Sequence, residues 1–125
     1  MKALDINSGI DALELVPGAR TTTTGNGTGV DIRDYEGIAT IILSVGAGGG
    51  TTPTLDIKIQ DSADNSSFTD VTGKAFTQVT TTASKQTMSL DIDNVRRYVR
   101  AVKTVGGTSP TFDGSVVMVA RKKFL

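Results

Sequence analysis

The chain has 125 residues, and its 13 basic and 13 acidic side chains give a formal net charge of zero. It contains no cysteine and no histidine, which excludes disulfides, cysteine-ligated metal centres and every Ser–His or Cys–His nucleophile arrangement. There is no basic excess, no apolar run near the ~20 residues of a membrane-spanning helix and no apolar stretch of a signal peptide, so we expect no nucleic-acid partner and no membrane.

The N-terminal residues predict extended chain. Apolar and polar side chains alternate over 4–7 and again over 13–15, which predicts two short extended pieces. Ser8-Gly9 breaks the pattern between them, and Pro17-Gly18 predicts a turn after the second piece. A short helix over 9–16 is the alternative interpretation.

Residues 1–29 as a whole are predicted to form an extended N-terminal arm or an edge segment. The four threonines at 21–24 favour an edge strand. The stretch Gly-Asn-Gly-Thr-Gly at 25–29 has almost no side chain to bury, so it predicts a flexible loop. This loop separates the segment from the main body, which we expect to be one β-sandwich domain over 30–125.

The most apolar run in the chain is Ile-Ala-Thr-Ile-Ile-Leu-Ser-Val at 38–45. Its length and its β-branched side chains predict a central strand that is buried on both faces. The glycines at 46–50 predict a loose loop after it. Residues 54–60 alternate strictly between apolar and polar side chains, which predicts an antiparallel strand with one solvated face.

Further strand candidates follow towards the C-terminus, at 68–71, 75–79, 84–92, 97–105 and 115–121. The alternation over 97–105 does not show which of its two faces belongs to the core, and 106–110 predicts a turn. Many short strands without a helical period predict an all-β protein. We expect an antiparallel β-sandwich or small barrel of Greek-key or jelly-roll type.

Two acidic groups are candidates for chemistry. Asp61, Asp64, Asn65 and Asp70 could form a calcium loop, because calcium prefers oxygen ligands, but the EF-hand pattern is absent and a polar turn is favoured. Asp91 and Asp93 could form a carboxylate pair for acid–base catalysis. A solvated strand end, balanced by the arginines that follow, is the favoured interpretation of that pair.

Glycine-rich and basic segments offer two further hypotheses. The stretches 25–29 and 46–50 lack the Gly-Lys-Ser/Thr ending of a phosphate loop, so we interpret both as ordinary loops. If the last two strands pair, a basic patch could form from Arg96, Arg97, Arg100, Lys103 and the tail 121–123. Few aromatic side chains accompany these residues, so an acidic protein surface is favoured over nucleic acid as the partner.

Two segments carry a resemblance to a known family. The first is the strand–turn–strand Leu-Asp-Ile-Lys-Ile-Gln-Asp-Ser-Ala-Asp-Asn-Ser-Ser-Phe-Thr-Asp-Val at 55–71, and the second is Arg-Tyr-Val-Arg-Ala-Val-Lys-Thr at 97–104. Together they resemble small jelly-roll proteins from the head genes of tailed phages, including capsid cement or decoration proteins. Discoidin-like jelly rolls are also similar, but Phe68 replaces their usual Trp.

The resemblance implies a virion structural protein that binds the major capsid protein on the outer capsid surface. Synthesis in the host cytoplasm, a homotrimer that bridges capsomers, and an N-terminal arm that orders on docking are further expectations from it. A tail, fibre or baseplate component and a carbohydrate-binding module are the alternatives. The absence of Trp argues against sugar binding. We expect no enzyme, no cofactor, no metal site and no small-molecule substrate.

Overall fold

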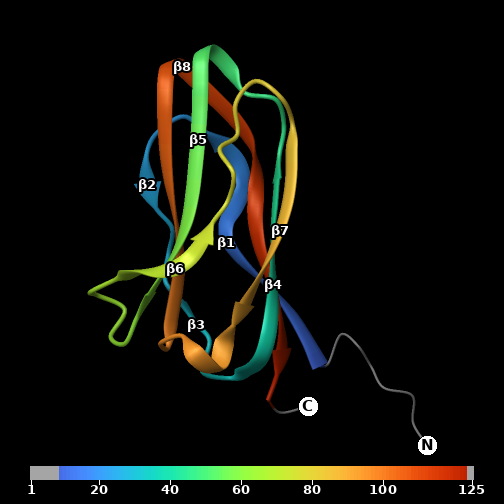
Figure 1. Ribbon diagram of the computed structural model, residues 1–125, viewed down its shortest axis with the longest axis vertical. Helices are drawn as coiled ribbons and strands as arrows, with labels where there is room; N and C mark the ends of the chain where they lie inside the picture. Colours follow the sequence, from blue (N-terminus) through green and yellow to red (C-terminus); the bar gives the residue numbers. More distant parts are fainter. Residues whose placement is uncertain (1–8, 124–125) are drawn as a thin grey trace, which may run out of the picture.

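The computed structural model describes residues 9–123 of the chain (Figure 1). Its elements are eight β-strands and one short 3₁₀ helix, η1 (Ile92–Asn94). The strands are β1 (Ile10–Thr21), β2 (Gly25–Asn26), β3 (Val30–Asp31), β4 (Tyr35–Val45), β5 (Gly49–Ser62), β6 (Thr69–Ala75), β7 (Ser84–Asp91) and β8 (Tyr98–Lys122). The predicted all-β fold is confirmed.

All strand pairs are antiparallel, and they form two layers that share β8. One layer, here called sheet A, has the order β1, C-terminal part of β8, β4, β7. The other, sheet B, contains β2 and β3 on one side of the N-terminal part of β8, and β5 and then β6 on its other side. Neighbouring strands are mostly not consecutive in the chain, and β5 and β6 are the consecutive pair among the described strands. The predicted antiparallel β-sandwich is confirmed.

A folded two-stranded ribbon generates both layers. Residues 35–62, which comprise β4 and β5, pair with β8 from Lys122 back to Tyr98 with only small register shifts. The ribbon bends at the upper end of Figure 1, where it leaves sheet A and enters sheet B. The glycines at 46–50 and the predicted turn at 106–110 therefore belong to one shared corner, not to a loose loop and an independent turn.

The corner needs a glycine on each of its two strands. Gly50 and Gly107 have φ angles of +97° and +105°, a region that other residues rarely adopt. A Cβ atom on Gly50 would lie 2.4 Å from the Ser109 carbonyl oxygen, and one on Gly107 would lie 2.6 Å from the Thr52 carbonyl oxygen. Both strands therefore bend in close backbone contact, which lets the ribbon turn without losing its partner.

The two layers enclose one continuous apolar core. In β8, Val99 and Ala101 are fully buried, so the face that carries them belongs to the core, while Tyr98 and Arg100 point outward. Lys103 shares the inward face with Val99 and Ala101. The structure thus resolves the ambiguity over 97–105 by placing this segment between β5 and the short strands β2 and β3.

β4 differs from its prediction, because only one of its faces is buried. Ala39, Ile41 and Leu43 are fully buried, whereas Ile38 on the opposite face is 65% exposed. Within residues 9–123 no layer covers this outer face of sheet A. The even-numbered residues of β4 point outward. Two of them, Thr40 and Ser44, are polar, and this is the feature of the sequence that indicates a solvent-exposed face.

β1 also corrects the predictions for its segment. It is one strand along β8 that contains the predicted extended piece at 13–15 and continues through Pro17-Gly18, so there is no turn at that pair and no helix over 9–16. The piece predicted at 4–7 lies outside the described residues. Register shifts between Glu14 and Val16 and between Val16 and Ala19 accommodate the Pro-Gly pair as bulges. Proline is tolerated here because β1 is an edge strand.

The glycine-rich stretch 25–29 is not a free loop. It contributes β2, and the Gly27 amide donates to the Ala101 carbonyl oxygen at 2.7 Å. A Cβ atom on Gly27 would lie 2.6 Å from the Leu15 carbonyl oxygen. Residues 10–31 therefore form one edge of each sheet. The arm or edge segment was expected over 1–29, and its residues 1–8 lie outside the described residues.

Candidate interaction surfaces

The predicted acidic cluster forms a self-contained turn around Asp64. The Asp64 carboxylate accepts hydrogen bonds from the amides of Ser66 and Ser67 at 3.0 and 2.9 Å and from the Ser62 hydroxyl at 2.9 Å. These bonds favour the ionised carboxylate and lower the pKa of Asp64 to about 2. The side chain supports the tip of the β5–β6 hairpin, as expected for a polar turn.

The other acidic residues of the cluster point elsewhere. Asp61 is 2.8 Å from the Arg96 guanidinium, and Asp70 lies 3.0 Å from the Lys58 ammonium. No group of three or more acidic side chains among residues 9–123 is arranged to hold a metal ion. The oxygens of this segment thus satisfy the protein's own donors.

Asp91 and Asp93 do not share a strand face. Asp91 ends β7 and caps η1, where its carboxylate accepts from the Asp93 amide and from the Asn94 side chain. Asp93 lies two residues later, within η1, and accepts a long hydrogen bond from the Gly37 amide at 3.4 Å. The predicted alternation fails because the strand stops at Asp91, and the pair has a local structural role.

The residues of the predicted basic patch lie on different faces and in different sheets of the structure. Arg97 pairs with Asp31 at 2.8 Å. Arg100 lies 3.9 Å above the Phe68 ring and donates to the Gln60 side-chain oxygen at 2.8 Å. Lys103 points inward. Arg121 and Lys122 belong to sheet A, so the predicted residues do not form one continuous surface.

Part of that patch does converge at the lower end of the sandwich. Arg96, Arg97 and Lys123 line a cavity of about 310 Å³ together with Arg33. The rest of the lining comes from Ile32, Tyr35, Ile92, Asp93 and Val95. We call this region the basic end. Arg96 and Arg97 each already have a carboxylate partner there. Arg33 was not among the predicted residues, because its approach to the tail depends on how β3 and β8 pack.

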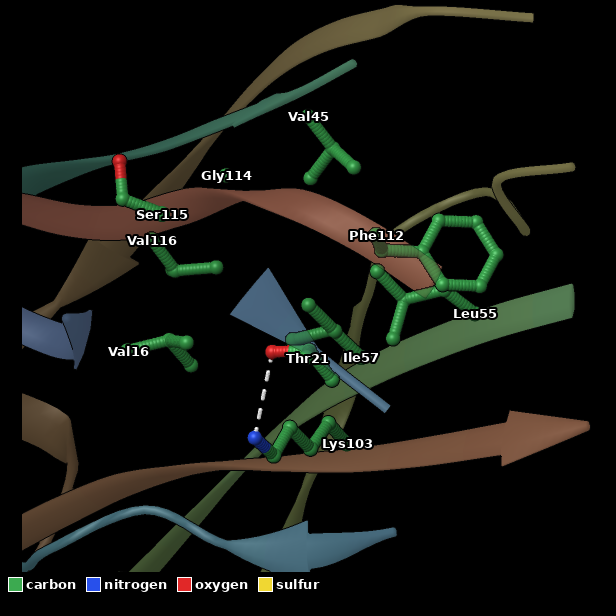
Figure 2. A pocket seen from close by; sticks show the side chains of 10 residues that line it. All are labelled: Val16, Thr21, Val45, Leu55, Ile57, Lys103, Phe112, Gly114, Ser115 and Val116. Atoms are coloured by element: carbon green, nitrogen blue, oxygen red, sulfur yellow. Dashed lines mark hydrogen bonds between the residues drawn. The ribbon is translucent and has the colours of Figure 1, made fainter. Parts of the chain in front are cut away.

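Lys103 lies between the two sheets (Figure 2). Its ammonium group donates to the Thr21 hydroxyl at 3.3 Å. The cavity beside it has a volume of about 10 Å³ and is lined mainly by apolar side chains, among them Val16, Ile57 and Phe112. Such a volume holds about one water molecule. This lysine–hydroxyl pair therefore has no room for a substrate on the cavity side.

The outer face of sheet A has an apolar centre, and charged side chains such as Glu14, Lys85 and Arg121 lie beside it. The register places six apolar side chains on it from three adjacent strands, and small polar groups such as Thr40 and Thr87 continue it. Its six apolar members, which we call the apolar face, are Ile10, Ala12, Ile38, Ile42, Val117 and Val119. Ile10 and Ile38 are 41% and 65% exposed.

The outer face of sheet B has the opposite character. Its central residues are charged or amide side chains that bind one another, such as Gln60, Lys58 and Asp70. Desolvating such a network is costly, since each buried polar group must keep a partner. Covering a contiguous apolar face has a much smaller desolvation free energy cost, and exposed patches of this kind mark protein–protein contact sites. The two faces thus differ in what they can bind.

No helix within residues 9–123 is long and apolar enough to cross a membrane. The fold and these surfaces together define a β-sandwich whose distinctive feature is an apolar sheet face that residues 9–123 leave uncovered.

No family model and no curated protein sequence matches the chain. Among solved structures, the SPBc2 prophage-derived protein YomS has a similar fold, with a TM-score of 0.54 at 13% sequence identity. The match covers 98% of this chain and 100% of that one. The likeness thus concerns the whole sandwich and both of its sheets, and at this identity it shows a shared fold.

Proposed function

We propose that this chain is a phage virion structural protein without enzymatic activity. In this role it is a cement or decoration protein that binds the major capsid protein on the outer capsid surface and bridges capsomers, as a homotrimer on the virion. Two findings support the proposal: the resemblance of the segments 55–71 and 97–104 to such proteins, and the fold shared with a prophage-derived protein over nearly the whole chain.

The observation that carries the proposal is the apolar face. Each Å² of apolar surface removed from water contributes about 25 cal/mol, and a stable protein–protein contact covers roughly 800 Å² on each partner. The branched side chains at the centre of this sheet face supply this kind of contact, because the six apolar residues themselves carry no polar groups that must be desolvated. The basic end offers a second surface of different chemistry, where Arg33 and Lys123 lie beside the two ion-paired arginines.

Two surfaces of different chemistry are what a bridging protein needs. A protein that contacts two neighbouring capsomers binds the assembled shell and not the separate subunits. Such selective binding stabilises the assembled state by mass action. The stabilisation grows with the concentration of free protein relative to its dissociation constant.

Co-sedimentation with purified phage capsids tests the proposal. We expect the wild-type chain to sediment with expanded capsids and not with unassembled capsid protein. The variant Ile42→Lys places a charge at the centre of the apolar face and should weaken capsid binding about tenfold or more, since it buries an unpaired charge at the contact.

The matched control is Thr104→Lys, which adds the same side chain to the outer face of sheet B and should bind like the wild type. Thermal unfolding of both variants verifies that they fold. Equal binding of both variants, or no binding of the wild type to capsids, contradicts the proposal. Binding of the isolated chain to a glycan array would support the carbohydrate-binding alternative instead.

A further inference from the structure

Three of the four sheet edges carry features that block the addition of another strand. β1 has two bulges and Pro17. β6 has a register shift and a glycine at positive φ, Gly73. β2 and β3 are two residues long each. Bulges, proline and short length are the devices by which proteins prevent edge-to-edge pairing.

The fourth edge, β7, has none of these devices. It pairs with β4 through eight consecutive residues without a register shift, and it contains neither proline nor glycine. Within the described residues no strand lies on its other side, and Figure 1 shows it at the outer margin of sheet A. One row of its backbone donors and acceptors is therefore available to a further strand.

The sequence of β7 is complementary to itself in the antiparallel direction. Lys85, Thr87, Ser89 and Asp91 lie on its outward face, in register with the outward residues of β4. If two copies pair about a twofold axis at Met88, Lys85 of each copy lies opposite Asp91 of the other, and Thr87 lies opposite Ser89. Directly opposite side chains are about 5 Å apart, so this register forms two ion pairs and two hydroxyl pairs.

We propose that β7 pairs with β7 of a second copy of this chain, about a twofold axis at Met88, and joins the two A sheets into one. The contact is isologous, as in most protein dimers. Two further features support a second copy of this chain as the partner of the β7 edge. The charges at the two ends of the strand have opposite sign, and the zero net charge of the chain imposes little self-repulsion. The inference does not depend on capsid binding.

Light scattering coupled to size-exclusion chromatography of the full chain tests the pairing. We expect a mass of two chains, or of six where trimers also form. Lys85→Glu places a glutamate opposite Asp91 of the second copy, so its two like-charge pairs should weaken the association about tenfold or more. The matched control, Lys74→Glu, makes the same change on β6, the edge strand of sheet B, and should associate like the wild type.

Cross-linking gives a second measurement that does not depend on charge. The chain has no cysteine, so Met88→Cys introduces a single thiol at the proposed axis. We expect it to form a disulfide-linked dimer on mild oxidation, whereas Thr72→Cys on β6 should form no disulfide-linked dimer under the same conditions. A wild-type mass of one or three chains, an unaffected Lys85→Glu variant, or equal cross-linking of both cysteines overturns the proposal, whatever the result of capsid binding.

Discussion

At the scale of single residues, Tyr35 links the start of β4 to the start of β1 and, through Asp11, to the end of β8. Its hydroxyl donates to the Asp11 carboxylate at 2.6 Å, and Asp11 is also 3.8 Å from the Lys122 ammonium. Partial burial, and then the hydrogen bond to Asp11, raise the pKa of Tyr35 to about 12. The neutral phenol is therefore the form that the folded state prefers.

This preference predicts a loss of stability at alkaline pH. An unfolded tyrosine ionises near pH 10 and the folded Tyr35 near pH 12, so its contribution is fully present below about pH 10 and is lost as pH rises towards 12. Urea unfolding of the wild type and of Tyr35→Phe at pH 9 and at pH 11.5 checks this. Their difference in unfolding free energy should shrink at the higher pH, and a constant difference would contradict the assignment.

At the scale of elements, the shared corner of the ribbon determines how β4 and β5 pass from one sheet to the other. Gly50 combines a positive φ with a close backbone contact, whereas Gly37 has a φ of +79° with nothing within 4 Å of an added Cβ atom. Strain and steric contact can thus be separated by comparing the same substitution at the two positions.

We expect Gly37→Ala to lower the free energy of unfolding by about 1–2 kcal/mol, which is the cost of a left-handed conformation for a residue with a side chain. Gly50→Ala should cost distinctly more, because the added methyl group also displaces the facing β8 backbone. Chemical denaturation of both variants measures the two values. Equal losses would mean that the backbone contact at the corner does not matter.

At the scale of the whole molecule, β1 is part of the core and not an appendage. Leu15 is 1% exposed and lies inside the same apolar cluster as the buried residues of β4, β5 and β8. One edge of each sheet comes from residues 10–31, so the sandwich is complete only when this segment is in place.

Leu15→Ala should therefore lower the free energy of global unfolding by about 2–5 kcal/mol, since it leaves a cavity in the core. Unfolding should remain a single transition in fluorescence and circular dichroism. The neighbouring Glu14→Ala serves as the control, because Glu14 is exposed and should change stability by less than about 0.5 kcal/mol. If Leu15→Ala behaves like the control, residues 10–21 fold separately from the sandwich.

The sequence by itself determined the fold class. Period-two alternation over 54–60, β-branched runs and missing helical periods require strands, because a strand places successive side chains on opposite faces. It also determined the excluded chemistries, since histidine and cysteine are absent. The polar turn around Asp64 could be predicted as well, because the bonds that form it join residues only two or three positions apart.

Only the tertiary structure decided which strand faces meet solvent and which residues gather. The inward placement of Lys103 could not be predicted from the local pattern, because burial depends on which distant segment covers each face. The apolar face joins residues from both ends of the chain, and the basic end brings Arg33 to Lys123. Strand pairing over such sequence separations follows from the packing of the whole core, and the surfaces proposed to bind partners follow from that pairing.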